Sequence, residues 1–213
     1  MVFQVSQDLT LRRAIADDAE WAAALLFDAG PALFSYILAS PPMQAQKLLQ
    51  QAFTFPNHAF SYEHTQVAEM QGTPVGIMIG YSGDLKRQAD EKVHFVMARL
   101  MPLQKLPKIL VNVADLSRIK QDVKPSDYYI LGISVLPAFR HQGIASYLLA
   151  EAEAEAEAQD CAAICVDVSY TNIPAQRLLE KRGYATVCSK TTDRFEQMTR
   201  SGGIHRMVKR LID

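Results

Sequence analysis

Apolar and polar positions change their period several times along the first half of the chain. Residues 9–13 alternate weakly, and residues 62–70 and 74–82 read as two strands around the Gly-Thr-Pro of residues 72–74, a composition typical of a tight turn. Between the first strand and these two, apolar residues recur at helical spacing in three stretches, residues 19–30, 31–40 and 41–53. The pattern predicts a strand, a layer of helices and a β-hairpin.

Residues 83–127 return to a helical period after the hairpin. Apolar side chains between Val93 and Leu100 recur at i, i+3, i+4 and i+7, and a second such set runs from Ile109 to Leu116. This segment therefore predicts two amphipathic helices.

Strands and helices alternate in the second half of the chain. The expected strands are residues 128–136, 162–170, 184–190 and 204–212, and the expected helices begin near Gly143 and cover residues 174–182. Alternating strands and helices favour parallel neighbours, whereas a hairpin requires antiparallel ones. The fold class expected is α/β, of an α+β-like kind, with a mixed sheet and helices on both of its faces.

The tract AEAEAEAEA, residues 150–158, repeats with a strict period of two, as a strand would. Alanine and glutamate are strong helix formers and poor strand formers, so the composition outweighs the period. We expect the tract to continue the helix that begins near Gly143, with its glutamates spread over the solvated outer surface.

Composition and charge narrow the class of protein. A chain of 213 residues with 49% apolar and 21% charged residues can bury one substantial core, so we expect residues 1–213 to form a single domain. A formal net charge of -1 argues against nucleic acid or an anionic membrane as a partner. The amino terminus lacks the order of a signal peptide and apolar runs stay shorter than a membrane span, which predicts a cytoplasmic protein.

The three cysteines predict reduced thiols rather than a metal centre. Cys161, Cys165 and Cys188 lie among apolar neighbours, without a paired Cys-x-x-Cys or a nearby histidine. We therefore expect no metal.

The most informative stretch follows the strand at residues 128–136 and leads into the helix near Gly143. Its residues are Arg140, His141, Gln142, Gly143, Ile144, Ala145 and Ser146. The first N–H groups of a helix lack internal acceptors and carry partial positive charge, and a glycine lets a ligand approach the backbone. Such a loop can cradle a pyrophosphate, although one glycine before a helix is also a common structural turn.

A second motif makes the first more specific. Asn172, Ala175, Leu178, Gly183 and Tyr184 follow Gly143 with a fixed spacing that starts 29 residues after it. Together the two motifs resemble the GNAT superfamily of acyl-CoA-dependent N-acyltransferases. The close match covers residues 128–188, and the helical segment 83–127 is longer than the usual family link.

The resemblance implies a fold and a coenzyme site. It implies a mostly antiparallel sheet with one splayed parallel pair, a coenzyme-binding core at residues 128–190, and a helical insertion at about 83–127. It also implies that acetyl-CoA rests its pyrophosphate on the amides of residues 140–146 and runs its pantetheine arm beside Ile133, Ser134 and Val135. The Val135 amide would polarise the thioester carbonyl, and Asn172 would orient the arm.

The catalytic groups are less well defined, because Leu179 occupies the position where the family often has an acidic tyrosine. The candidates are Tyr129, on the central strand, Asp127, two residues earlier on the same face, and Tyr184. Tyr129 and Asp127 could equally cap the strand entrance, and Tyr184 could simply pack in the core.

The leading hypothesis is an N-acetyltransferase that moves an acetyl group from acetyl-CoA to a primary amine of a small molecule or protein in a ternary complex. The alternatives are a GNAT-fold module that binds acyl-CoA without turnover and a structural α/β domain without a coenzyme. The segments expected to line the acceptor side are residues 28–60 and 83–127. A homodimer is a habit of the family, and no motif names the acceptor amine.

Overall fold

The computed structural model describes residues 9–211 and begins with a strand, three helices and a hairpin, as the sequence predicts. These elements are β1 (Leu9–Arg13), α1 (Ala19–Ala29), α2 (Pro31–Ile37), α3 (Pro42–Phe53), β2 (Thr65–Met70) and β3 (Thr73–Ser82). Short 3-10 turns at Ala16–Asp18 and Tyr62–His64 precede α1 and β2.

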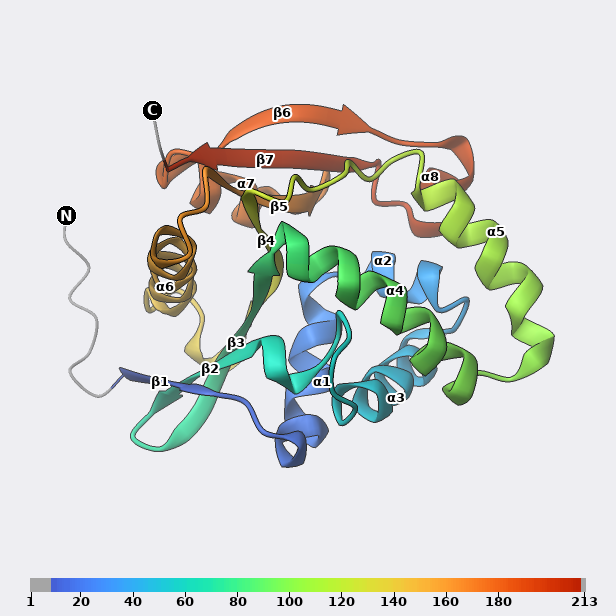
Figure 1. The fold of residues 1–213 in the computed structure, drawn as a ribbon, viewed down its shortest axis with the longest axis horizontal. Helices are drawn as coiled ribbons and strands as arrows, with labels where there is room; N and C mark the ends of the chain where they lie inside the picture. Colours follow the sequence, from blue (N-terminus) through green and yellow to red (C-terminus); the bar gives the residue numbers. More distant parts are fainter. Residues whose placement is uncertain (1–8, 212–213) are drawn as a thin grey trace.

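The rest of the chain contains two further helices and then alternating strands and helices. These elements are α4 (Gly83–Leu100), α5 (Leu106–Leu116), β4 (Asp127–Val135), α6 (Ile144–Ala158), β5 (Ala163–Ser169), α7 (Ile173–Lys181), β6 (Ala185–Lys190), α8 (Asp193–Thr199) and β7 (Ile204–Arg210). Figure 1 shows α4 and α5 extending away from the strands on the side opposite α6.

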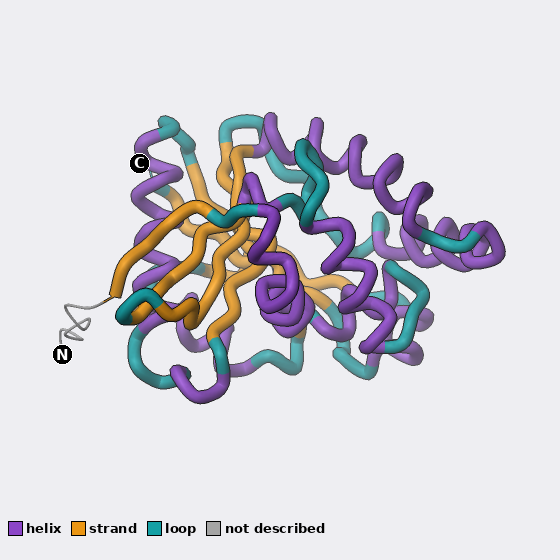
Figure 2. The backbone as a smooth tube through the Cα atoms, turned by 90° about the horizontal axis from the view of Figure 1, so that it is seen from below, coloured by secondary structure: helices purple, strands orange, loops and turns teal. Residues whose placement is uncertain are grey.

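The strands form one seven-stranded sheet in the order β1-β2-β3-β4-β5-β7-β6. Among the strands of residues 9–211, only β4 and β5 pair in parallel, and every other pair of neighbours is antiparallel. The mixed, mostly antiparallel sheet with helices on both faces is therefore confirmed, and Figure 2 shows the strands together with helices around them.

Alternate residues of the central strands face two separate hydrophobic cores. Ile77, Ile79 and Tyr129 pack against α1 and α3 on one face, whereas Met78 and Ile130 pack against α6 on the other. This alternation follows from the two-residue period of a strand, and it explains why strands buried on both faces read as nearly continuous apolar runs.

Three sequence predictions need correction at the level of single elements. The helix α8 was not predicted, because its 7 residues are too few to show a helical period in the sequence. The strand expected at residues 62–70 begins at Thr65, after a 3-10 turn capped by Ser61. The hairpin turn was expected at residues 72–74, but it lies at Gln71 and Gly72, which both have positive φ. The last strand was expected at residues 204–212, of which residue 212 lies outside the described residues.

The tract at residues 150–158 is helical as predicted, but its glutamates do not all lie on the outer surface. Glu153 is buried against the sheet, where its Oε2 accepts from Arg182 Nη2 at 2.9 Å and pairs with Lys209 Nζ at 3.0 Å. A spacing of two residues moves around a helix by about 200°, so some of the glutamates must turn inward. The expectation of a fully solvated glutamate face was therefore wrong.

The parallel pair β4–β5 separates part of the way along. Pairing runs from Asp127↔Ala163 to Ile130↔Val166, after which β4 pairs only with β3 and β5 pairs only with β7. A β-bulge lies directly after this last pair, since Gly80 opposes Ile130, Ile79 opposes Gly132, and Leu131 is extra. A bulge bends its strand and increases the local twist, so it gives a physical cause for the separation.

Gly132, within this bulge, lets the end of α1 approach the strand closely. A Cβ added to Gly132 would lie 2.8 Å from the Cβ of Ala29, the last residue of α1. We predict that Gly132→Ala lowers the free energy of unfolding by about 1–3 kcal/mol, the usual cost of overpacking, in urea denaturation. The double variant Ala29→Gly/Gly132→Ala, which removes the clashing methyl, should recover much of that loss. If Gly132→Ala and the double variant were equally stable, a close contact between residues 29 and 132 would be contradicted.

Candidate active site

The loop between β4 and α6 has the backbone conformation that an anion cradle needs. After a 3-10 turn at Pro137–Phe139, His141 has φ of +62° and Gly143, the N-cap of α6, has φ of +86° and ψ of -3°. Gly143 is in the left-handed region, where a glycine carries no steric penalty. The sequence therefore has a glycine where the chain must reverse tightly into the helix.

Within the described residues, the first amides of α6 have no hydrogen-bond partner. Its first backbone hydrogen bond runs from Tyr147 N–H to the Gly143 carbonyl at 2.9 Å, so the N–H groups of residues 144–146 precede the helical ladder. Gly143 has no side chain with which to cap them. These amides, together with the positive end of the helix dipole, form a ready site for phosphate oxygens.

Arg140 and Gln142 are held by the loop itself, whereas His141 extends into solvent. Arg140 Nε donates to the Val135 carbonyl at 3.0 Å, and Gln142 Nε2 donates to the Ala138 carbonyl at 3.3 Å. All three side chains belong to exposed residues. The Arg140 contact ties the loop to the end of β4 through Nε and leaves the terminal guanidinium nitrogens available to an anion.

The strand residues expected to line the arm of the coenzyme lie beyond the point of separation. Ile133 is partly buried and packs toward α6, as does the buried Val135, while Ser134 faces the opposite side of the sheet. On the side facing β5, this part of β4 has no strand partner. Its backbone groups are therefore placed as an extended ligand would require.

Asn172 lies at the other edge of the same opening, between β5 and α7. Its Oδ1 accepts from the Ala175 amide at 3.3 Å, so the residue is the N-cap of α7. The carboxamide nitrogen remains available on this exposed residue. Asn172 thus has a structural role that the sequence did not predict, in addition to the position expected of it.

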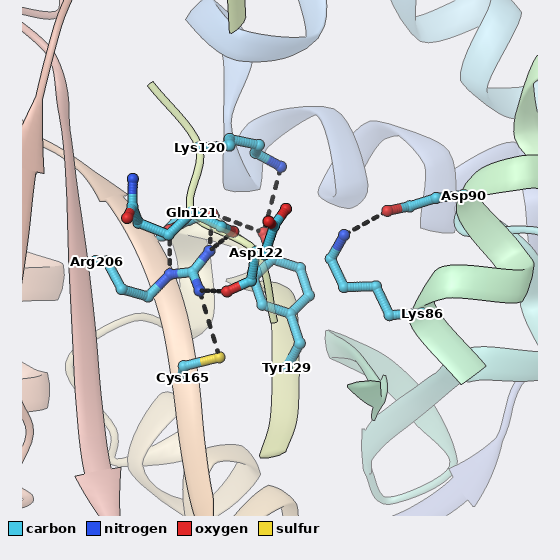
Figure 3. A network of polar contacts seen from close by, with 9 residues as sticks. Lys86, Asp90, Lys120, Gln121, Asp122, Tyr129, Cys165 and Arg206 are labelled. Atoms are coloured by element: carbon cyan, nitrogen blue, oxygen red, sulfur yellow. Dashed lines mark hydrogen bonds and ion pairs between the residues drawn. The ribbon is translucent and has the colours of Figure 1, made fainter. Parts of the chain in front are cut away.

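Tyr129 lies where the two strands part. Its hydroxyl donates to Asp167 Oδ2 at 3.1 Å and accepts from Lys120 Nζ at 3.3 Å (Figure 3). Tyr129 is one residue before the last parallel pair and Asp167 is one residue after it, so this hydrogen bond crosses the apex of the opening. Burial, with the negative charge of Asp167, raises the pKa of Tyr129 well above its ordinary value, which keeps the hydroxyl protonated.

Arg206, on β7, holds Asp167 and the linker before β4 together. Its Nε and Nη2 donate to the two carboxylate oxygens of Asp167 at 2.6 and 3.0 Å, and Nη2 also donates to the Gln121 carbonyl at 2.8 Å. Burial acts to lower the pKa of Arg206, but the hydrogen bonds to Asp167 outweigh it and raise the pKa above its ordinary value. Arg206 is therefore a fixed cation that sets the position of the residue after Lys120.

The structure does not bring the three candidate catalytic residues together. Asp127 is partly exposed at the start of β4, where its Oδ1 accepts from Ser126 Oγ at 3.4 Å. Tyr184 is 3% exposed and packs in the core beside α6, on the face of the sheet away from Tyr129, and burial raises its pKa. Only Tyr129 lies at the apex of the opening.

Sequence reasoning missed the charged residues around Tyr129, which are Lys86, Asp90, Lys120, Asp167 and Arg206. They come from four parts of the chain that only the tertiary fold brings together. The one local signal was Asp167, a carboxylate in an otherwise apolar strand, since a charged residue is seldom buried without a partner.

Two other findings concern the described residues as a whole. Within residues 9–211, no three His, Cys, Asp or Glu side chains come close enough to hold a metal ion. None of the helices in that part of the chain has the length and apolar character that crossing a bilayer requires.

Comparisons with known proteins agree with this architecture. The sheet is mixed, with one parallel pair between β4 and β5, and the loop after β4 leads into the amino end of α6. The sequence model of the Acetyltransferase (GNAT) family matches residues 32–184. The chain therefore belongs to the GNAT acetyltransferase family, which uses an acyl-CoA. No curated protein sequence is similar enough to count as a match.

Several solved structures share the fold. An acetyltransferase crystal structure is 23% identical, with a TM-score of 0.66 over 95% of this chain and 99% of that one. An N-acetyltransferase from Staphylococcus aureus Mu50 is 17% identical, with a TM-score of 0.69 over 94% of this chain and 100% of that one. A PaiA N-acetyltransferase from Thermoplasma acidophilum in complex with coenzyme A is 12% identical, with a TM-score of 0.52 over 95% of this chain and 98% of that one.

Proposed function

We propose that the protein is an N-acetyltransferase that moves an acetyl group from acetyl-CoA to a primary amine of a small molecule or protein within a ternary complex. One observation carries this proposal: strands β4 and β5 separate toward the carboxyl end of β4, and the chain leads from that same end into the amides at the start of α6. Family membership supports acyl transfer, and one neighbour of the same fold was solved with coenzyme A.

The residues present fit such a coenzyme. The left-handed Gly143 and the free amides of residues 144–146 suit a pyrophosphate, with Arg140 adding a full positive charge. Residues 133–135 pair with β3 on one side, and their backbone groups on the side facing β5, with the carboxamide of Asn172, suit a pantetheine arm with its own amide groups. When bound, the coenzyme supplies an activated thioester, whose carbonyl the Val135 amide would polarise.

We assign the proton-handling role at the apex to Tyr129 ahead of Asp127 and Tyr184. The hydroxyl of Tyr129 accepts from Lys120 and donates to Asp167, and its raised pKa keeps it protonated, so it would give that proton to the leaving sulfur in place of Asp167. The amine proton would leave through water. Because a thiolate is a tolerable leaving group, positioning by the cradle supplies much of the rate even though Leu179 is buried in the core and carries no acidic group.

We expect Tyr129→Phe to lower kcat by about a hundredfold or more, the usual size of a lost acid–base contribution, while the Kd of acetyl-CoA stays the same. The readout is acetyl-CoA-dependent release of free thiol. Tyr81→Phe is the matched control, because the Tyr81 ring lies 6.1 Å from that of Tyr129 and its buried hydroxyl has no hydrogen-bond partner among residues 9–211. Asp127→Asn and Tyr184→Phe test the other candidates, and a greater loss in either would reassign the role.

The second candidate function is an acyl-CoA-binding module without turnover, which the apolar Leu179 favours. The two functions differ in one measurement, thiol release in the presence of amines. Release that depends on an amine would eliminate the binding module, whereas coenzyme binding without release by any amine would support it.

Three further features belong to the same proposal. We propose that residues 1–213 act as one domain, in which residues 83–127 form a helical insertion, 128–190 the coenzyme-binding core, and residues 28–60 and 83–127 line the acceptor side. We also propose a cytoplasmic enzyme, in keeping with the composition of the chain, and a homodimer, by analogy with the family. Size-exclusion chromatography with light scattering measures the last directly.

A further inference from the structure

Three cations converge on the ring of Tyr129. Lys86 Nζ, Lys120 Nζ and the guanidinium carbon of Arg206 lie 5.1, 5.7 and 5.5 Å from its centroid. They come from α4, from the linker between α5 and β4, and from β7 (Figure 3). Such convergence concentrates positive charge at the apex of the opening between β4 and β5.

Two carboxylates offset two of these cations. Asp167 forms a bidentate pair with Arg206, and Asp90 pairs with Lys86. Lys120 forms no ion pair within residues 9–211, and its Nζ donates to the neutral Tyr129 hydroxyl at 3.3 Å. With Lys120 protonated, the cluster carries one positive charge in excess, on a lysine with further N–H groups to donate.

The excess charge lies in partly buried surroundings. Burial lowers the pKa of Lys120, and Asp167 only partly opposes this effect. An unpaired cation in such a site costs free energy, which a bound anion would remove. Lys86 and Asp90 are partly accessible, with side chains 18% and 46% exposed, so the cluster is open to solvent on the α4 side.

Arg206 fixes the position of Lys120 and is itself fully engaged. Its guanidinium donates to the carbonyls of Gln121 and Asp122, the residues that follow Lys120, at 2.8 and 3.4 Å. The remaining donors of Arg206 are directed at Asp167 and Cys165. Lys120, rather than Arg206, is therefore the cation left for a ligand.

We propose that the acceptor is an amine that also carries an anionic group, a carboxylate or a phosphate, and that Lys120 binds this group beside Tyr129. This proposal names the substrate class and rests on the proposed acetyl transfer. A simple alkylamine approaches as a cation and would be repelled by the excess positive charge, whereas an amine with an anionic group offsets it. Lys120 is then a specificity-determining residue on the insertion 83–127.

The test uses two matched pairs of probes that differ in one anionic group: L-phenylalanine with L-phenylalaninamide, and phosphoethanolamine with ethanolamine. We expect wild-type protein to favour the anionic member of at least one pair at least tenfold in kcat/KM, measured by thiol release. Lys120→Met should reduce that preference at least tenfold and leave the Kd of coenzyme A unchanged. Lys120→Arg should keep the preference, and the exposed Lys190→Met on β6 serves as the control.

The same probes are also compared by thermal unfolding in the presence of coenzyme A. If coenzyme A binds but no probe is acetylated, the proposed transfer fails, while a larger stabilisation of wild type than of Lys120→Met by the anionic probes still supports the anion site. Which pair responds distinguishes a carboxylate from a phosphate. A preference for the neutral members, equal responses within both pairs, or an unchanged preference in Lys120→Met would overturn the inference.

Discussion

Gly143→Asp is expected to abolish the stabilisation of the protein by acetyl-CoA while leaving it folded. Gly143 has φ of +86°, a conformation that aspartate tolerates better than most residues, so the fold should survive. The new carboxylate would stand among the amides at the start of α6 and repel a pyrophosphate. At a concentration about 100 times the wild-type Kd, acetyl-CoA should stabilise the wild type by about 2.7 kcal/mol. The variant should lose that shift and bind at least a hundredfold more weakly.

The chain offers a closely matched control for this prediction. Gly183, after α7, has φ of +87°, and a Cβ added there would contact nothing within 4 Å. Gly183→Asp therefore introduces the same residue at nearly the same φ, after α7 and away from the β4–α6 loop. It should keep the acetyl-CoA shift. Loss of the shift in both variants, or in neither, would contradict the assignment of the loop as the pyrophosphate site.

Arg206→Met is expected to be the most destabilising substitution at the apex. The side chains of Arg206 and Asp167 are 6% and 5% exposed, so removing the cation leaves a buried carboxylate without its partner. Breaking a buried pair in this way costs about 3–5 kcal/mol. Urea denaturation followed by circular dichroism should show a loss of that size in the free energy of unfolding.

The double variant Asp167→Leu/Arg206→Met separates the lost pair from the stranded charge. Because neither ion of the pair remains, it should be more stable than Arg206→Met alone. Arg12→Met, which removes a cation whose side chain is 34% exposed, should cost less than Arg206→Met. Equal stability of Arg206→Met and wild type would mean that the pair makes no contribution to the fold.

The sequence predicts most of the fold because the chain signals its elements locally. The strands were predicted from runs of apolar and β-branched residues, and the α-helices of the described residues, except α8, from the helical spacing of apolar residues and from prolines near helix starts. The Thr192 cap of α8 was present in the sequence, but seven residues carry too little period to be recognised. The inward turn of Glu153 was missed because it depends on Arg182 and Lys209, which lie far away in the chain.

One part of the candidate site could be predicted from local sequence, and another part could not. The loop at residues 140–146 and Asn172 could be predicted from short sequence motifs, because a phosphate-binding loop is made from consecutive residues. Gly132 could have predicted the bulge, since a glycine inside a strand often marks one. The network of Lys120, Asp167 and Arg206 could not be predicted, because it spans residues up to 86 positions apart whose contacts depend on the fold of the linker and β7.

The most direct test of the account is calorimetric titration of the wild-type protein with acetyl-CoA and, separately, with S-acetylpantetheine, which lacks the pyrophosphate. The account predicts saturable binding of acetyl-CoA and binding of S-acetylpantetheine at least tenfold weaker, because the amides at the start of α6 have no phosphate to hold. Absence of acetyl-CoA binding, or equal affinity for the two thioesters, would contradict it.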